Sequence, residues 1–239
     1  KLDEIEADTG FDVRIHVDGA SGAMIAPFCQ PELNWDFRVA RVNSISTSGH
    51  KYGLVYPGVG WVVWRDQSVL PESLVFHVSY LGGDMPTLAL NFSRPGAQVL
   101  LQYYQFLRLG REGYRAVQQN SLDVAQFLSG EIERMGPFEL VSRGDTIPVF
   151  AWTLKAGHTD IWNLYDLADR LRMKGWLVPA YPMAADMSTT VLQRIVVKVG
   201  LSRDLASSLI SDIRAEVEFL DRPNAPLPRE RTTGPGFHH

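Results

Sequence analysis

One long stretch, residues 95–135, carries apolar side chains at the spacing of an α-helix and separates two regions with different patterns. Its apolar positions recur at steps of three and four: Val99, Tyr103 and Phe106, then Ala125, Leu128, Ile132 and Met135. Gly110 and Gly113 lie inside the stretch, and because glycine weakens a helix, we expect a kink or a split there. The sequence therefore predicts a long helix that begins in one domain and ends in another.

Before this stretch, three short segments have the patterns of β-strands. Residues 12–18 alternate apolar and polar side chains and end in Asp18, and residues 42–48 form a second extended segment. Residues 60–64 are apolar throughout and are bounded by turn-forming residues, which indicates a strand buried on both faces. The connections are rich in loop residues, so we do not expect simple hairpins.

After the helical stretch, the patterns become shorter and indicate a compact α+β module. The expected elements are strands at residues 147–154, 177–181 and 191–199, and an amphipathic helix at residues 161–174 that stops at Gly175. Ser202 is expected to cap a last helix. The apolar face of that helix comprises Leu205, Leu209, Ile213, Val217 and Leu220. Beyond Asp221 the chain is rich in proline and poor in apolar residues, which predicts a flexible tail.

Composition and charge are those of a globular protein with one large or two small domains. Of the 239 residues, 45% are hydrophobic and 21% are charged, which is enough for a sizeable core. The net charge of −4 provides no basic surface for a phosphate backbone, so nucleic acid is not an expected partner. The single cysteine, Cys29, cannot form an internal disulfide, and no apolar run reaches the roughly 18 residues of a membrane span. We therefore expect no membrane span and a cytoplasmic location. The start at Lys1, without an initiator methionine, is consistent with a portion of a longer protein.

A carboxylate and a lysine form the most informative pair in the sequence. Asp18 ends the first expected strand and is followed by three small residues, which leave room for a flat group. Lys51 follows the second strand, where partial desolvation would make its amine nucleophilic. A carboxylate that keeps a pyridine nitrogen protonated and a lysine that forms a Schiff base are the minimal protein groups for pyridoxal phosphate chemistry. Taken singly, each has a plainer interpretation: Lys51 is a solvated surface charge, and Asp18 accepts hydrogen bonds from loop amides.

Other motifs around this pair are weaker. Ser48 and His50 are suited to donating hydrogen bonds to phosphate oxygens. Ser48 and Lys51 also fit the S-x-x-K pattern of serine β-lactam-binding enzymes, but the S-D-N and K-T-G motifs do not follow. Residues 58–60 lack the third glycine of a dinucleotide fingerprint. His16 and Asp18 are possible metal ligands, yet no third ligand is spaced to join them, so no metal is expected.

Several segments together resemble the glutamate decarboxylases, in particular the bacterial-type members of the group II pyridoxal-phosphate-dependent decarboxylases. They are HVDGASGAMIAPF, SISTSGHKYG, YLGG, NFSRPG and FLRLGREGY, and the resemblance extends over essentially the whole chain. It implies an α/β fold of the type I aminotransferase-like kind, with a mostly parallel sheet in a large domain followed by a small α+β domain. We accordingly expect residues 1–122 to be the C-terminal part of the large domain, residues 123–222 the small domain, and residues 223–239 a flexible tail.

Carried over to this sequence, the resemblance implies which groups hold pyridoxal 5'-phosphate. Lys51 would form the Schiff base, Asp18 would pair with the pyridine nitrogen, and Ala20 would pack against the ring. Ser48 and His50 would contact the phosphate. Four of these five residues are those singled out above at the ends of the first two strands, and Ala20 is added by the resemblance.

The remaining implied roles concern the substrate and a shared site. Ser93 would reach the phosphate of the neighbouring subunit, so that a homodimer or higher homo-oligomer shares its active sites; its plainer interpretation is a helix cap. Arg194 would hold the α-carboxylate of the amino-acid substrate through a bidentate guanidinium. Tyr80 would protonate the substrate carbon, a step also open to Lys51, and is otherwise a surface loop aromatic. His238 would enter the active site near neutral pH and leave it when acid protonates the imidazole.

The implied reaction converts L-glutamate to 4-aminobutyrate and carbon dioxide. It consumes a proton, which in the bacterial members of the family implies a part in acid resistance. Family members are about twice as long as this chain, and the half that is absent here reads the distal carboxylate of the substrate. Two alternatives therefore stay open: another group II decarboxylase, acting on an aromatic amino acid or on aspartate, and a non-catalytic fragment that serves as an assembly module.

Overall fold

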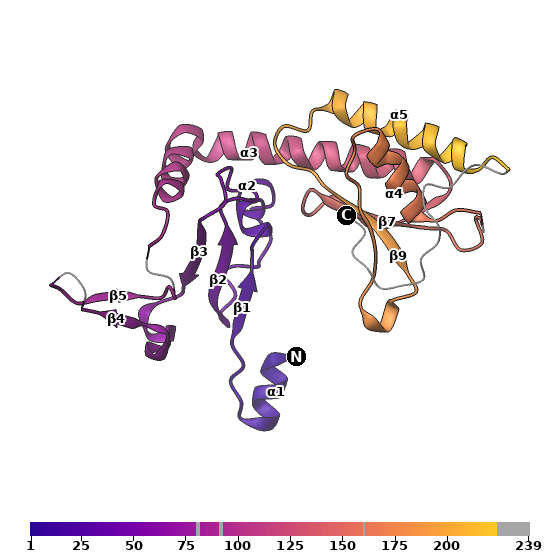
Figure 1. The fold of residues 1–239 in the computed structure, drawn as a ribbon. Coiled ribbons are helices and arrows are strands. Elements are labelled where there is room, and N and C mark those ends of the chain that lie inside the picture. The colour runs from indigo at the N-terminus through magenta and orange to yellow at the C-terminus, as the bar shows by residue number, and fades with distance from the viewer. Residues whose placement is uncertain (80–81, 91–92, 160, 224–239) are drawn as a thin grey trace. The chain divides into compact units, whose positions relative to one another are not determined.

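The structure is a computed structural model, and it describes residues 1–79, 82–90, 93–159 and 161–223. The chain forms two compact units, Lys1–Ala116 and Val117–His239. Figure 1 shows the order of the elements along the chain. The long helix α3 (Ala97–Arg134) begins in the first unit and ends in the second, as the helical spacing predicts. The domain assignments 1–122, 123–222 and 223–239 stay predictions.

The first unit contains a three-stranded sheet in the order β1-β2-β3. β1 (Ile15–Asp18) and β2 (Val42–Ser48) run parallel, with Asp18 opposite Ser46. β3 (Gly60–Trp64) runs antiparallel to β2. The three expected strands are therefore present, although the first is shorter than expected. Because β1 and β2 are parallel, their carboxyl ends lie at the same edge of the sheet.

Short elements complete the first unit. They are α1 (Leu2–Thr9), η1 (Gly22–Met24), α2 (Ala26–Cys29), η2 (Gln67–Val69), η3 (Glu72–Leu74), β4 (Phe76–Val78) and β5 (Met85–Thr87). β4 and β5 pair as a separate antiparallel hairpin. Neither α1 nor this hairpin was expected from the sequence.

Gly110 breaks the regular geometry of α3. Its φ of 56° and ψ of −167° lie outside the helical region, in a conformation that is accessible mainly to glycine. Of the two glycines expected to kink or split this stretch, Gly110 does so, whereas Gly113 keeps helical dihedral angles. The prediction of a long interrupted helix is therefore confirmed.

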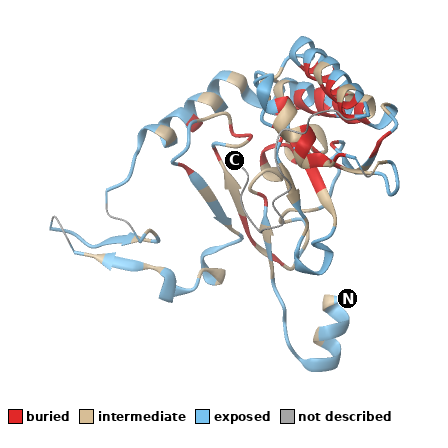
Figure 2. Cartoon of the chain, turned by 45° about the vertical axis from the view of Figure 1, so that its right-hand side comes forward, coloured by how far each residue is buried: buried red, intermediate tan, exposed pale blue. Residues whose placement is uncertain are grey.

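The second unit is an antiparallel sheet with helices and a single apolar core. Its strands, in the order β6-β7-β9-β8, are β6 (Phe138–Arg143), β7 (Val149–Leu154), β9 (Val191–Val196) and β8 (Ala180–Pro182). Its other elements are the second half of α3, α4 (Leu164–Met173), η4 (Ala185–Met187) and α5 (Arg203–Leu220). Figure 2 shows buried residues concentrated in these elements. The largest fully buried side chains of this core include Leu128, Ile132, Phe138, Phe150, Trp152, Leu167 and Leu171.

Side-chain caps start the two helices that follow β7. Asn163 accepts hydrogen bonds from the main-chain N–H groups of Tyr165 and Asp166, and the Asp166 carboxylate accepts one from the N–H of Asn163. Ser202 Oγ accepts a hydrogen bond from the N–H of Leu205 at 3.2 Å, which confirms the expected cap of α5. Such caps satisfy amide groups that have no partner inside the helix. Within the described ranges, no helix combines the length and hydropathy needed to cross a bilayer.

Two expectations about burial are wrong, and one strand of the second unit was missed in addition to the β4–β5 hairpin. β3 is not buried on both faces, since Val62 and Val63 are 54% and 51% exposed. In the described part of the chain, β3 pairs only with β2 and forms an edge of the sheet, so its continuous apolar pattern does not report a central strand. Leu205 is 47% exposed because it lies in the first turn of α5, beside its capped end, whereas the rest of the expected apolar face is buried. β6 was also not expected from the sequence.

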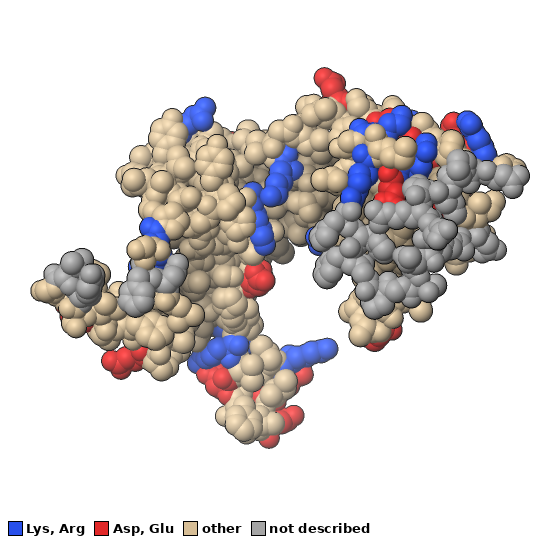
Figure 3. Space-filling view, in the orientation of Figure 1, with Lys and Arg blue, Asp and Glu red and all other residues tan. Residues whose placement is uncertain are grey.

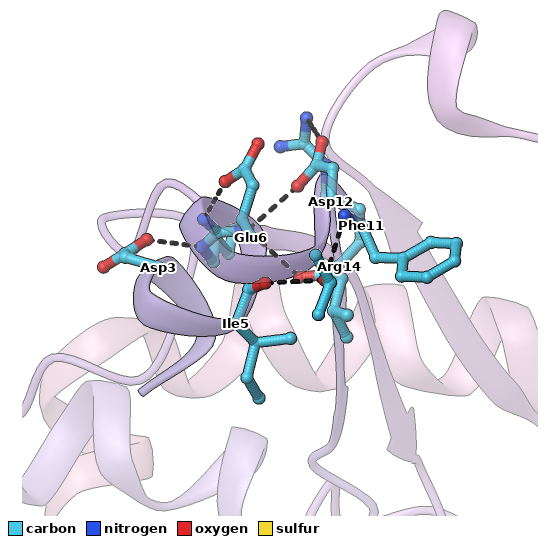
Figure 4. Close-up of polar contacts among 9 residues, drawn as sticks. Asp3, Ile5, Glu6, Phe11, Asp12 and Arg14 are labelled. Carbon is cyan, nitrogen blue, oxygen red and sulfur yellow. Dashed lines mark hydrogen bonds and ion pairs between the residues drawn. The ribbon is translucent and has the colours of Figure 1, made fainter.

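Charge, rather than apolar burial, holds α1 to the sheet. None of the residues of α1 is buried. The guanidinium of Arg41 donates hydrogen bonds to Asp3 at 2.7 Å and Asp12 at 2.9 Å, and it also pairs with Glu6. Asp12 pairs in addition with Arg14, and Figure 4 shows how these carboxylates lie around the end of α1. The hydrogen bonds to Glu6 and then Asp3 raise the pKa of Arg41 above its ordinary value. Figure 3 shows charged side chains of both signs gathered over α1.

The substitution Gly110→Ala tests the break in α3. Alanine would have to adopt the same dihedral angles, so we expect the free energy of unfolding to fall by about 1–3 kcal/mol. Among the described residues, no heavy atom lies within 4 Å of the added Cβ, so the backbone conformation alone accounts for this loss. The measurement is urea denaturation followed by circular dichroism.

Gly130→Ala is the matched control on the same helix. Gly130 has helical geometry, and its added Cβ would meet only the Arg134 side chain, at 3.5 Å. We expect this variant to gain about 0.5–1 kcal/mol. A Gly110→Ala variant as stable as Gly130→Ala would contradict the assigned backbone geometry.

Candidate functional site

The ends of β1 and β2 bring the carboxylate and the lysine segment to one edge of the sheet. Asp18 is the last residue of β1, and Ser48 is the last residue of β2. The main-chain N–H of Ser48 donates a hydrogen bond to the carbonyl oxygen of Ala20 at 3.2 Å, which ties together the loops that follow the two strands. Lys51 lies three residues beyond this link. This edge is where α/β sheets commonly place their ligands.

Asp18 is exposed and keeps one carboxylate oxygen available. Its Oδ1 accepts a hydrogen bond from the N–H of Ala20 at 3.0 Å, which is the loop-amide role considered for it above. Among the described residues, Oδ2 accepts no hydrogen bond and forms no ion pair. The turn is also tightly packed, since a Cβ on Gly19 would stand 2.8 Å from the carbonyl oxygen of Ser46 and 2.6 Å from the Cβ of Ala23. The turn therefore fixes the direction of the Asp18 carboxylate.

Lys51 sits partly buried in a compact turn. Its main-chain N–H donates to the carbonyl oxygen of Ser48 at 3.3 Å, and the N–H of Gly49 donates to the carbonyl oxygen of Val59 at 3.3 Å. No carboxylate in the described part of the chain forms an ion pair with the Lys51 amine. The amine is thus not neutralised by a neighbouring side chain and is available to a ligand.

The residue after the lysine is buried and uncharged at neutral pH. Tyr52 is 2% exposed, and burial raises the pKa of its hydroxyl to about 12. A phenolate beside Lys51 would form an ion pair with the lysine ammonium group, in competition with a ligand. Because Tyr52 stays protonated, it does not act as an anionic partner or as a base near neutral pH.

The donor set at this edge fits pyridoxal phosphate. The Asp18 carboxylate suits a pyridinium nitrogen, and the Lys51 amine suits an aldehyde. Ser48 is partly buried and His50 is exposed, and both can donate to phosphate oxygens. Ala20 has a small side chain and is partly buried in the loop after β1. The expected roles of these residues stay predictions, but each carries the chemistry that its role requires.

The other expected site residues lie elsewhere. Ser93 is exposed and precedes the first residue of α3, Ala97, by four positions, too far to act as its N-terminal cap. Arg194 is exposed on β9 in the second unit, and its guanidinium carbon lies 5.7 Å from the centre of the Tyr181 ring. Tyr80 and His238 fall outside the described residues.

His16, weighed above as a possible metal ligand, is bonded to a neighbouring strand. Its Nδ1 lies 2.8 Å from the hydroxyl of Ser44 on β2. The described ranges contain no group of three or more His, Cys, Asp or Glu side chains placed to hold a metal ion.

Two buried residues of α3, behind the lysine turn, were missed in the sequence. Gln102 and Tyr114 are 0% and 1% exposed, and both donate hydrogen bonds to the carbonyl oxygen of Gly53 at 2.9 Å. A signal was present: Gln98, Gln102 and Gln105 recur at steps of four and three, so they share one face of the expected helix.

The substitution Gly53→Ala tests the tight packing of the lysine turn. An added Cβ would stand 2.6 Å from the carbonyl oxygen of Gly49 and 2.8 Å from its Cα, so the main chain must shift. We expect a loss of about 1–3 kcal/mol in the free energy of unfolding. The control is Gly60→Ala, where the nearest atom would be the carbonyl oxygen of Thr47 at 3.8 Å. Equal stability of the two variants in urea would refute the close approach of Gly49 and Gly53.

The pKa of Tyr52 predicts a loss of stability at alkaline pH. The ordinary value is 10.0 and the folded value is about 12, so the folded chain binds this proton more tightly than the unfolded chain. The resulting stabilisation is complete below the unfolded pKa and is lost as the pH rises through the folded pKa. Tyr52→Phe should remove this part of the pH dependence, whereas Tyr56→Phe, at an exposed position, should retain it. The measurement is the urea midpoint at a series of alkaline pH values; parallel curves for wild type and Tyr52→Phe would exclude a buried, protonated Tyr52.

Comparisons with known proteins agree with this chemistry. Residues 1–155 match the family described as the pyridoxal-dependent decarboxylase conserved domain. The glutamate decarboxylase of Aliivibrio fischeri is 50% identical over 239 residues, which cover 100% of this chain and 52% of that protein. The chain therefore spans about half the length of the curated relatives it matches.

Solved structures share the fold. The glutamate decarboxylase of Lactobacillus brevis has a TM-score of 0.87 and 49% identity, over 93% of this chain and 50% of that one. The tryptophan decarboxylase of Catharanthus roseus has a TM-score of 0.70 at 18% identity, over 92% of this chain and 47% of that one, and shows the fold alone. The expected α/β fold of the type I kind is thereby confirmed, and the cofactor that the family implies is pyridoxal 5'-phosphate. Of the expected mostly parallel sheet, this chain contributes one parallel and one antiparallel pair. The chain belongs to the family of pyridoxal-dependent decarboxylases.

Proposed function

We propose that the protein carrying this chain decarboxylates L-glutamate to 4-aminobutyrate and carbon dioxide with the help of pyridoxal phosphate. The observation that carries this proposal is the pair formed by Asp18 and the Lys51 turn, at the ends of adjacent parallel strands. The identity of about half of all positions with named glutamate decarboxylases supports it.

In this proposal, the residues after β1 and β2 bind and orient the cofactor. When bound, pyridoxal phosphate supplies an aldehyde for an amine and a ring that draws electrons from the bond to be broken. Lys51 binds through its amine. The Asp18 carboxylate holds a proton at the ring nitrogen, because an opposite charge favours the protonated form. Ala20 packs against the ring, and Ser48 and His50 donate hydrogen bonds to the phosphate.

The second unit and the loops before α3 supply the groups proposed for substrate and proton transfer. Arg194 holds the α-carboxylate through two parallel hydrogen bonds, and its exposed position on β9 leaves the guanidinium accessible. Tyr80 or Lys51 delivers the proton to the substrate carbon. Ser93, which is exposed, contacts the phosphate bound by a neighbouring subunit. His238 in the tail blocks the site near neutral pH and leaves it when its imidazole is protonated.

Glutamate is favoured over the alternative substrates by the comparisons at the level of sequence. This chain is 50% identical to the Aliivibrio fischeri glutamate decarboxylase but 18% identical to the tryptophan decarboxylase structure. Decarboxylation of an aromatic amino acid or of aspartate is the second candidate, and a non-catalytic assembly module is the third. The identity of the amine that the protein releases separates the first two, and the failure to bind the cofactor covalently marks the third.

The proposed protein is a cytoplasmic homodimer or higher homo-oligomer. An exposed apolar stripe on the first half of α3 supports self-association, because contiguous apolar surface of this kind marks interaction sites. The stripe recurs at steps of three and four and comprises Leu100, Tyr103, Tyr104 and Leu107. A single cysteine, Cys29, agrees with a reducing compartment.

Replacing the two central residues tests this function. Lys51→Ala should abolish covalent attachment of the cofactor and lower the rate of glutamate decarboxylation about 10³-fold or more. Asp18→Asn should retain the attachment and lose most of the rate, because a neutral amide does not hold the ring proton. The measurements are the mass of the protein after borohydride reduction with pyridoxal phosphate, and the amines released from glutamate, aspartate and tryptophan.

Lys155→Ala, at an exposed position in the second unit, is the control for loss of a lysine. It should keep both attachment and rate. Attachment that persists in Lys51→Ala would exclude Lys51 as the binding amine. Release of an amine only from tryptophan or aspartate would reassign the substrate.

A further inference from the structure

One side chain of α3, Gln102, lies against both ends of the turn that carries Lys51. Its Nε2 donates a hydrogen bond to the carbonyl oxygen of Gly53 at 2.9 Å. Its Oε1 would lie 2.8 Å from a Cβ added to Gly49 and 2.5 Å from a Cβ added to Gly53. Both glycines are therefore needed for the amide to approach, and Lys51 lies midway between them in the sequence.

Tyr114 completes a closed group of hydrogen bonds at the end of this turn. Its hydroxyl donates to the carbonyl oxygen of Gly53 at 2.9 Å and accepts from Gln102 Nε2 at 2.9 Å. Burial raises the pKa of Tyr114, so the hydroxyl keeps its proton. The ring is stacked on Phe28, with centres 5.0 Å apart, and contacts Phe106 at 5.4 Å. These contacts fix the donor that reaches Gly53.

The same face of α3 also holds the chain just after the turn. Gln105 Nε2 donates to the carbonyl oxygen of Leu54 at 3.3 Å, and Gln98 Nε2 donates to that of Pro57 at 3.0 Å. Leu54 has a φ of 66°, the only positive φ of a non-glycine residue in the described part of the chain. A backbone in this region persists only where surrounding contacts impose it, and such positions cluster at functional sites. The face of α3 that carries Gln98, Gln102 and Gln105 supplies these contacts.

Filling the space at this position does not require a hydrogen-bond donor. Gln102 is fully buried, and within the described residues its Oε1 accepts no hydrogen bond, which is unfavourable for a buried carbonyl oxygen. Elsewhere on α3, the buried positions include the apolar Leu128 and Ile132 and a second amide, Gln118. An apolar residue of similar length fills the space but does not donate to Gly53. The hydrogen bond that Gln102 donates to Gly53 offsets the free-energy cost of burying its amide group.

We propose that Gln102 is a positioning residue for Lys51. It packs against Gly49 and is hydrogen-bonded to Gly53, and together with Tyr114 it thereby sets the direction of the lysine amine. This inference rests on the proposed function, in which Lys51 binds pyridoxal phosphate. Gln102 touches neither cofactor nor substrate. Its effect is on the geometry from which the lysine amine reaches the cofactor, and orientation of this kind changes rates strongly.

The test is the rate at which pyridoxal phosphate attaches to the apo-form of the protein carrying this chain, followed by the growth of visible absorption. In Gln102→Met, which keeps the length of the side chain and loses the donor, the second-order rate constant should fall about tenfold. Tyr114→Phe should give a smaller fall, of about three- to fivefold, since one hydrogen bond to Gly53 remains. After full loading, kcat for glutamate should fall while KM stays near that of wild type.

The matched control is Gln119→Met. Gln119 is an exposed glutamine of α3 that donates to Asp123 at 2.8 Å, and its replacement should leave the attachment rate unchanged. Circular dichroism and thermal melting establish that each variant is folded at the temperature of the assay. If Gln102→Met does not fold, the rate measured for Tyr114→Phe decides.

The outcomes separate the two levels of the argument. If wild type binds the cofactor, Lys51→Ala does not, and Gln102→Met or its substitute Tyr114→Phe attaches it at the wild-type rate, Gln102 is only a packing residue and the proposed function survives. A lower melting temperature with an unchanged attachment rate has the same meaning. If wild type itself does not attach pyridoxal phosphate, the proposed function fails and the positioning role fails with it.

Discussion

The parallel pairing of β1 with β2 is the interaction on which the candidate site depends. A parallel pair puts both carboxyl ends at one edge of the sheet, so Asp18 and the segment that begins at Ser48 meet although they are far apart in the sequence. An antiparallel pair would send them to opposite edges. The hydrogen bond from the N–H of Ser48 to the carbonyl oxygen of Ala20 continues this pairing beyond the end of β1, into the loop that follows it.

The two units differ in how much of their apolar surface they bury. The second unit buries a continuous set of large apolar side chains from α3, α4, α5 and its sheet. The first unit buries Gln102 and Tyr114 behind the lysine turn, and it leaves much of its apolar surface on α3 and β3 exposed. The curated relatives that this chain matches are about twice as long as the chain.

The features of the fold and of the candidate site that could be predicted from the sequence are mostly those that depend on neighbouring residues. The strands at 42–48 and 60–64, the break at Gly110 and the cap at Ser202 each follow from a few neighbouring residues, and each is present. The burial of β3 was misjudged because an apolar run does not reveal whether a strand is central or at an edge. The pair of Asp18 and Lys51 was recognised from its chemistry. In the structure, Asp18 ends β1 and Lys51 follows β2, and these two strands are parallel neighbours in the sheet. Gln102 was missed because its partner, the Gly53 carbonyl, is a main-chain atom from a distant segment: the spacing of the glutamines indicates a shared helix face but not what that face contacts.

The mode of attachment of α1 has its own consequence. Screening by dissolved ions weakens apolar contacts little, but α1 buries no side chain and is tied to Arg41, the residue before β2, through the carboxylates of Asp3 and Glu6. The Debye length shrinks from about 10 Å at 0.1 M to about 3 Å at 1 M ionic strength, and attractions between exposed charges weaken accordingly. We therefore expect the docking of the amino-terminal helix onto the first unit to weaken as the ionic strength of the solution rises.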